Sequence, residues 1–242
     1  MGPIRGRRPR RKRNPLLTEV STQEGGRTGA AAPAVTGAIL ELRGLACRRG
    51  RKRLFGDLDA QLAGGELLRI TGANGAGKTS LLKLICGLLA PEAGQVLWRG
   101  EPIGGQREAY HRELVHLGHA AALKDELSAL ENLRVAACVA GQRLGSADAR
   151  RALAEAGLAG REQLPARLLS QGQRRRAVLA RLAFADAALW VLDEPFNALD
   201  TAATGWLLGL LRAQLERGGM VVLTSHLPLA LDGALRQRSL AL

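Results

Sequence analysis

The sequence predicts an α/β fold built on a mostly parallel sheet. A glycine-rich loop, residues 72–79, lies between a short apolar stretch and an amphipathic one, as in a strand–loop–helix unit. Apolar strands and helical stretches then alternate along the chain, which is typical of a parallel sheet covered on both faces. One apolar strand, residues 188–193, leads into two adjacent carboxylates. With 242 residues, 46% of them hydrophobic, the chain can form one large domain or two small ones.

The individual elements can be placed in order from about Ala38 onward. The expected strands are residues 39–45, 58–62, 66–71, 95–99, 114–118, 188–193 and 220–225. The expected helices are residues 78–88 and 201–217, with a further helical region at 128–185 that is rich in Ala, Leu and Arg. Within that region Ser146 is an expected helix N-cap and Gly157 an expected stop. Residues 107–175 interrupt the alternation, so we expect a helical insertion into the α/β core.

The loop GANGAGKT matches G-x-x-x-x-G-K-[ST], the pattern of phosphate-binding loops. A loop between a strand and a helix aims backbone N–H groups and the positive helix end at one point, which suits a polyphosphate. Lys78 is expected to reach the terminal phosphates and the Thr79 hydroxyl to bind Mg²⁺. The alternative is a chance glycine-rich turn, which the flanking strand and helix disfavour. The expected phosphate-binding residues are Gly72, Asn74, Gly75, Gly77, Lys78, Thr79 and Ser80.

The two carboxylates after the apolar strand are candidate catalytic groups. In nucleotide hydrolases such a strand lies beside the strand of the phosphate loop, and we expect the same here. Asp193 would then hold Mg²⁺ through water, and Glu194 would orient or deprotonate the attacking water. The alternative is an acidic pair in a solvated turn.

Composition limits the other possibilities. No stretch approaches the ~20 uncharged apolar residues of a membrane span, so we expect a protein that is soluble by itself. The three cysteines lack zinc spacing and are expected to be small buried hydrophobes. The net charge is +13, and residues 1–37 hold eight Arg or Lys and two Glu, a net charge of +6. We expect this leader to be disordered, either as an inert extension or as a segment that binds nucleic acid or anionic lipid.

A second candidate anion site begins at LSQGQ, residues 169–173. Ser170 and Gln173 have the spacing of a capping box, so one interpretation is a simple helix start. A capped helix start that carries Gly172 can also bind an anion.

These motifs together resemble those of the ATP-binding-cassette (ABC) ATPases. LSQGQ resembles the family's LSGGQ signature, with Gln171 in place of one glycine. Asp-Glu-Pro follows the acidic strand, NALD at 197–200 resembles the family's S-x-L-D loop, and TSH at 224–226 matches its switch histidine. The motifs occur in family order, and the resemblance covers residues 39–242.

The resemblance implies a P-loop NTPase fold for residues 38–242: a RecA-like, mostly parallel sheet, an antiparallel β subdomain and an inserted α-helical signature subdomain. It also implies that two cassettes, a homodimer here, sandwich two ATP molecules with Mg²⁺. Each ATP touches the phosphate loop of one cassette and the signature of the other. By position, Ser170, Gly172 and Gln173 are implied to contact the partner's nucleotide, and His226 to act in catalysis. Asp200 has two interpretations, a dimer contact or a cap of the helix that starts at Thr201.

Two positions depart from the family pattern. The aromatic residue that stacks on adenine would fall near Arg49, whose guanidinium can also stack on a π-face. The glutamine of the switch loop would fall at His119, whose imidazole can ligate a metal or hold a water molecule. The alternative for His119 is a plain surface histidine.

The departures narrow the resemblance to one subfamily, the haem-exporter ATPases of bacterial cytochrome c maturation. Its features here are YHREL at 110–114, GH at 118–119, ALENL at 129–133, LSQGQRRR, and SHLPL at 225–229. The resemblance implies a peripheral protein on the cytoplasmic face of the inner membrane. The implied partners are an integral membrane permease subunit, CcmB, and further cytochrome maturation membrane subunits. No haem-ligand motif is present in the sequence.

Other functions stay open from the sequence alone. The chain could be the ATPase of another transporter, or a docking protein whose ATP hydrolysis is dispensable. A nucleic-acid-associated cassette ATPase is disfavoured, because the chain has neither the long coiled coils nor the second cassette of such proteins.

Overall fold

A parallel sheet of five strands forms the centre of the structure, a computed structural model that describes residues 40–225 and 236–242. The leader and His226 lie outside the described residues. The strand order is β6 (Leu114–Leu117), β7 (Leu189–Leu192), β8 (Met220–Thr224), β3 (Glu66–Thr71) and β9 (Arg236–Ala241). Every neighbouring pair is parallel.

The central strands β7, β8 and β3 are buried on both faces, as predicted, whereas the edge strand β9 is mostly exposed. Met220 and Val222 of β8 belong to one apolar cluster, while Val221 and Leu223 belong to the other. This alternation explains why the strand sequence is a continuous apolar run rather than an apolar–polar pattern. One expectation was wrong: the acidic strand β7 does not lie beside the phosphate-loop strand β3, because β8 lies between them.

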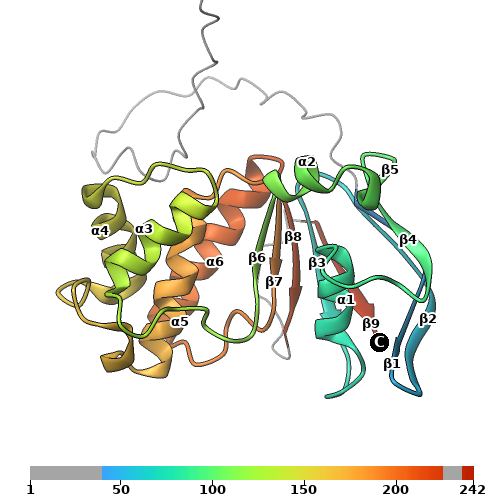
Figure 1. Ribbon diagram of the computed structural model, residues 1–242, viewed down its shortest axis with the longest axis horizontal. Helices are drawn as coiled ribbons and strands as arrows, with labels where there is room; N and C mark the ends of the chain where they lie inside the picture. The colour runs from blue at the N-terminus through green and yellow to red at the C-terminus, as the bar shows by residue number, and fades with distance from the viewer. Residues whose placement is uncertain (1–39, 226–235) are drawn as a thin grey trace, which may run out of the picture.

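A second, antiparallel sheet packs to one side of the first (Figure 1). Its order is β2 (Lys52–Leu62), β1 (Leu40–Arg49), β4 (Ala93–Trp98) and β5 (Glu101–Pro102). β1 and β2 form a hairpin in which Arg49 pairs with Lys52, so that Gly50, with φ 60°, and Arg51 make the turn. The pairing shifts by one residue next to Leu54, which indicates a bulge in β2.

The helices divide between the two faces of the parallel sheet. α1 (Lys78–Ile85) and α2 (Arg107–Arg112) lie on the side of the antiparallel sheet, whereas α3 (Ala129–Val139), α4 (Ser146–Leu153), α5 (Gln171–Leu179) and α6 (Thr201–Glu216) lie on the other (Figure 1). Four short helical turns lie between these elements, at Ile103–Gly105, Ala154–Leu158, Ala166–Leu168 and Ala180–Phe184. The helical side of the molecule therefore begins with α3. In contrast, α2 and β6 pack against the parallel sheet and α1.

Local signals explain several helix ends. All four residues expected on the apolar side of α1, namely Leu81, Leu82, Leu84 and Ile85, are buried. α1 ends earlier than expected because Gly87, with φ 65°, forms a left-handed cap in which the Leu88 N–H donates to the Lys83 carbonyl. α4 is capped by Gly145 rather than Ser146, and Gly157, with φ 75°, lies inside the turn that follows α4.

Two further findings concern the helical side. Cys138 on α3 is exposed, so the expectation that all three cysteines are buried was wrong for this residue. Within residues 40–225 and 236–242, no helix combines the length and the apolar character that crossing a membrane requires.

Candidate active site

The phosphate loop connects β3 to α1, as the sequence predicted. Gly77 caps α1 with φ 112° and without a side-chain hydrogen bond, so the first N–H groups of the helix have no side-chain acceptor. A Cβ atom at Gly77 would lie 3.1 Å from the Leu54 Cβ and the Phe55 ring. The Lys78 Nζ donates to the carbonyls of Gly72 and Ala73, at 2.7 and 3.2 Å. The ammonium group thus folds over the loop at the position where phosphates would bind.

Gly72 has a structural role at the start of the loop. Its φ is 144°, and a Cβ atom there would lie 2.8 Å from the carbonyl oxygen of Leu242. The Leu242 N–H donates in turn to the Thr71 carbonyl at 3.0 Å. The last described residue therefore packs against the loop, and only glycine fits this approach.

The Asp193 carboxylate joins three elements at the carboxyl ends of the strands. One oxygen accepts a hydrogen bond from the Thr79 hydroxyl of α1 at 2.8 Å, and the other from the Thr224 hydroxyl of β8 at 2.7 Å. Asp193 is only 3% exposed. Since a buried carboxylate is costly without partners, these two hydroxyls offset the cost of burying this side chain.

Glu194 follows in an unusual backbone conformation. Its φ is 46°, in the left-handed region that non-glycine residues seldom adopt. The Glu194 N–H donates to the Thr224 hydroxyl oxygen at 2.7 Å, so Thr224 holds the acidic pair at both residues. Strained backbone of this kind concentrates at functional sites.

The buried Arg175 of α5 supports the same turn from the other side. Its guanidinium donates to the carbonyls of Asp193 and Glu194, at 2.7 and 3.0 Å, and to that of Gly118 at 2.8 Å. Burial lowers the pKa of Arg175, and the nearby carboxylates of Asp193 and Glu194 oppose that lowering.

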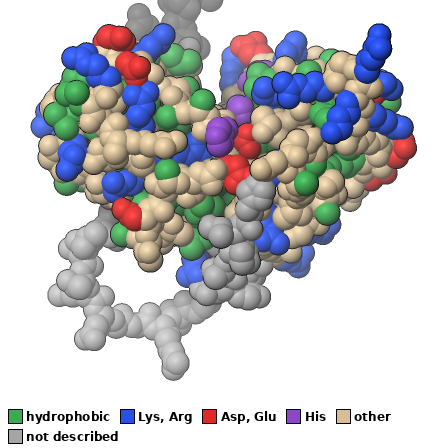
Figure 2. All heavy atoms as spheres, turned by 90° about the horizontal axis from the view of Figure 1, so that it is seen from below, with side chains coloured by type: hydrophobic (Ala, Val, Ile, Leu, Met, Phe, Trp, Pro, Cys, Tyr) green, Lys and Arg blue, Asp and Glu red, His purple; other side chains and the backbone are tan. Residues whose placement is uncertain are grey.

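These groups surround a cavity of about 520 Å³, within the usual size range of small-molecule sites. Its lining residues are Arg49, Leu54, Asn74, Gly75, Gly77, Lys78, Thr79, Ser80, His119, Asp193, Glu194 and Asn197. Figure 2 looks onto this end of the sheet and shows histidine and acidic side chains gathered near the centre, between two lobes. The antiparallel sheet thus contributes Arg49 and Leu54 to the same cavity as the phosphate loop.

The predicted signature residues lie outside that cavity, at the start of α5. Ser170 and Gln173 form the expected capping box: the Gln173 N–H donates to the Ser170 hydroxyl, and the Gln173 side chain accepts from the Ser170 N–H. A Cβ atom at Gly172 would lie 2.6 Å from the Ala198 carbonyl oxygen, so a glycine is needed for close packing. Asp200 caps α6 by accepting from the Ala203 N–H at 2.8 Å.

Sequence reasoning missed four residues of the site. Thr224, Asn197 and Arg175 stood in recognised motifs without a role of their own, while Leu54 lies before the strand expected at residues 58–62 and carried no signal. Ten of the residues predicted for the site line this one cavity, whereas Gly72 and the three signature residues do not. The remaining predicted residue, His226, lies outside the described residues.

The residues present fit a magnesium ion bound together with phosphates. Mg²⁺ prefers oxygen ligands and commonly takes one or two protein groups plus phosphate and water. Thr79 and Asp193 offer two such oxygens 2.8 Å apart beside the phosphate loop. Among the described residues no cluster of three or more His, Cys, Asp or Glu forms a metal site, which this mode of binding does not require.

The fold and the site define an ATP-binding-cassette ATPase. A sequence model of the ABC transporter family matches residues 55–197, and the chain belongs to this family. It is similar to the cytochrome c biogenesis ATP-binding export protein CcmA of Dechloromonas aromatica (strain RCB), with 53% identity over 78% of this chain and 92% of the relative. The corresponding protein of Nitrosomonas europaea is 47% identical, over 80% of this chain and 91% of the relative.

A solved structure supports the fold. The putative ABC transporter ATP-binding protein from Pyrococcus furiosus superposes with a TM-score of 0.71 and 25% identity, over 83% of this chain and 96% of that chain.

Replacing Thr224 by valine tests the support of the acidic pair. The variant loses the hydroxyl that donates to Asp193 and accepts from the Glu194 N–H. We expect ATP hydrolysis, measured as phosphate release, to fall about ten- to a hundredfold. ATP affinity should change less, because Thr224 does not line the cavity. Thr204→Val on α6 is the matched control, and a wild-type rate in Thr224→Val would contradict this role.

Proposed function

We propose that this chain is the ATP-hydrolysing subunit of an ABC export complex that serves cytochrome c biogenesis and couples hydrolysis to haem delivery. One observation carries the hydrolytic part: a phosphate loop and a buried acidic strand end are joined directly by the Thr79–Asp193 hydrogen bond. The similarity to the cytochrome c biogenesis ATP-binding export proteins supports the biological part. In this proposal residues 38–242 form the cassette, and its helical subdomain carries the signature.

The site residues have distinct proposed roles in hydrolysis. The loop N–H groups and Lys78 bind and orient the phosphates of ATP. Mg²⁺, held by Thr79 and Asp193, supplies charge neutralisation on the phosphate oxygens. Glu194 orients the attacking water and accepts its proton. His119 and His226 assist hydrolysis, and Arg49 contacts the base.

The position of the signature residues on α5 supports a site that is shared with a second cassette. Ser170, Gly172 and Gln173 lie apart from the cavity of their own chain, at the N-terminus of α5. In the proposed homodimer they contact the nucleotide held by the partner's phosphate loop. Each site is then complete only when two cassettes meet, which ties hydrolysis to association and separation of the pair.

Replacing Glu194 by glutamine tests the hydrolytic role. The amide keeps the shape of the side chain but is a very poor proton acceptor, so ATP should bind while hydrolysis slows by about a hundredfold or more. The variant should accumulate as an ATP-bound dimer in size-exclusion chromatography. Glu101→Gln, at an exposed residue of β5, is the matched control. Hydrolysis at the wild-type rate in Glu194→Gln would refute the assignment.

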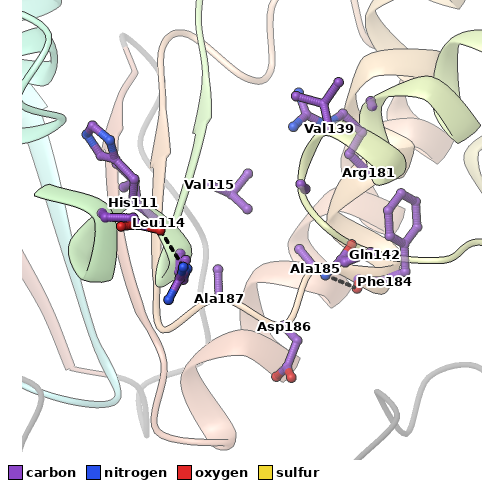
Figure 3. Close-up of a pocket in the computed structure, with 14 residues that line it drawn as sticks. His111, Leu114, Val115, Val139, Gln142, Arg181, Phe184, Ala185, Asp186 and Ala187 are labelled. Atoms are coloured by element: carbon purple, nitrogen blue, oxygen red, sulfur yellow. Dashed lines mark hydrogen bonds and ion pairs between the residues drawn. The ribbon is translucent and has the colours of Figure 1, made fainter. Parts of the chain in front are cut away.

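A groove at the amino ends of the parallel strands, opposite the nucleotide cavity, suits the proposed membrane partner. The groove encloses about 320 Å³ between the α/β part and the helical side. Figure 3 shows Leu114 and Val115 on one side and Val139, Arg181 and Phe184 on the other. Val139 is 84% exposed, Leu114 begins β6, and Ala187 lies just before β7, so the groove lies at the amino ends of these strands.

We propose that a cytoplasmic segment of an integral membrane permease subunit of the CcmB type occupies this groove. Because the groove lies at the amino ends of the strands, its occupant leaves the nucleotide cavity at the carboxyl ends free. The cassette is then peripheral to the cytoplasmic face of the inner membrane. Further cytochrome maturation membrane subunits are proposed to complete the assembly.

Replacing Val139 by aspartate tests the groove. The substitution should weaken assembly with the permease subunit by about tenfold or more, since a carboxylate in place of an apolar contact must lose its water when the partner docks. The ATPase activity of the isolated chain should be unchanged. Leu88→Asp is the matched control, because Leu88 is 59% exposed and does not line the groove. Co-purification with the permease subunit is the measurement, and undiminished recovery of Val139→Asp would contradict the groove as the interface.

The biological role is tested in a host that lacks this gene. Covalent haem in periplasmic c-type cytochromes is stained after complementation with the wild type or with Lys78→Ala. We expect the stain to be lost without the gene and restored only by the wild type. Normal c-type cytochromes in the deletion strain would refute the role in cytochrome c biogenesis, while the assignment as an ATPase would stand.

A further inference from the structure

One buried cation connects the signature helix to the catalytic strand end. Arg175 of α5 is 5% exposed. Its Nη2 donates to the carbonyl oxygens of Asp193 and Glu194, at 2.7 and 3.0 Å. Its Nη1 donates to the carbonyl oxygen of Gly118 at 2.8 Å and lies 3.5 Å from that of His119. A single guanidinium therefore holds the backbone of two separate loops.

The neighbouring arginines of the same helix behave differently. Arg174 forms an ion pair with Asp125 at 2.7 Å, and Arg176 lies 3.9 Å from the Asp200 carboxylate. Arg175 has no ion pair within the described parts of the chain, and its hydrogen bonds go to main-chain oxygens. Burying a cation with main-chain partners alone is costly. The planar guanidinium can donate hydrogen bonds to carbonyl oxygens of two loops at once, whereas the compact ammonium group of a lysine cannot reach both.

A second contact ties the same helix to the same turn. The Gly172 Cα packs so closely on the Ala198 carbonyl that a Cβ atom there would lie 2.6 Å from that oxygen. Ala198 has φ 62° and follows Glu194 in the turn after β7. The N-terminus of α5 and the turn that carries Glu194 are therefore packed directly against each other.

We propose that Arg175 is a positioning residue for hydrolysis, which transmits the position of the signature helix to Glu194 and to the His119 loop. The proposal rests on the function proposed above. When the signature of α5 engages the partner's nucleotide, the guanidinium fixes the backbone on which the Glu194 side chain and the His119 ring stand. Arg175 itself does not line the nucleotide cavity. Its loss should therefore slow hydrolysis while leaving ATP binding to the phosphate loop nearly intact.

The geometry also offers a direct rescue experiment. A second cavity of about 280 Å³ is lined by Arg175 together with His119, Gln171, Arg174 and Asn197, among others. Removing the Arg175 side chain would enlarge this cavity by the space of the guanidinium. A free guanidinium ion then has a route to the vacated position, where four carbonyl oxygens face it.

The experiment compares the full-length wild type with Arg175→Ala, Arg175→Lys and the control Arg176→Ala. We expect Arg175→Ala to lower kcat about tenfold or more, with KM for ATP within about threefold of wild type. Guanidinium chloride at millimolar concentration, far below denaturing levels, should raise the kcat of Arg175→Ala and leave Arg176→Ala unchanged. Arg175→Lys should fold normally and show an intermediate kcat, because it keeps the charge and loses the fork.

Several results would overturn the proposal. These are a wild-type kcat in Arg175→Ala, a rise in KM that matches the fall in kcat, or the absence of guanidinium rescue. If Arg175→Ala does not fold, Arg175→Lys decides, since a wild-type kcat in that variant would refute the need for the fork. Failure of the proposed function is distinguishable, because the wild type itself would then show no ATP hydrolysis.

Discussion

The site depends on the two hydrogen bonds that the Asp193 carboxylate accepts. This carboxylate follows a strand that is buried on both faces. One of its oxygens accepts from the Thr79 hydroxyl of α1 and the other from the Thr224 hydroxyl of β8. These bonds set the distance between the phosphate loop and the acidic strand, although β8 and not β3 is the neighbour of β7. A buried carboxylate without these hydrogen bonds would be costly, so the two hydroxyls are what allow this group to lie beside the phosphate loop.

The two sides of the molecule meet at this carboxylate. The antiparallel sheet packs Leu54 and Phe55 against the phosphate loop, and the helical side sends Arg175 to the backbone of Asp193. Both contacts join segments that are distant in sequence, and both act on main chain or on glycine rather than on a catalytic side chain. The consequence is a site whose chemical groups come from the parallel sheet and whose geometry is set by the flanking parts, which suits an ATPase that converts relative motion of its parts into work on a membrane partner.

The sequence predicted the parts of this arrangement that depend on local signals. The bounds of β3, the apolar side of α1 and the capping box at Ser170 were all confirmed, because each depends on residues within a few positions of one another. Strand order could not be predicted in the same way: the position of β8 between β7 and β3 depends on long-range pairing. β9 was missed because its sequence, RQRSLA, lacks an apolar pattern, as an edge strand with mostly exposed residues allows. Arg175 was missed because its partners are 18 to 57 residues away.

The most direct test of this account is the effect of Mg²⁺ on ATP binding in the wild type and in Asp193→Asn. The amide keeps the shape of the side chain and removes the charge beside Thr79. The account predicts that Mg²⁺ lowers the Kd for ATP about tenfold or more in the wild type and has little effect in Asp193→Asn. The Kd without Mg²⁺ should be similar in both proteins. An equal Mg²⁺-dependent gain in affinity for Asp193→Asn would contradict the central place given to this carboxylate.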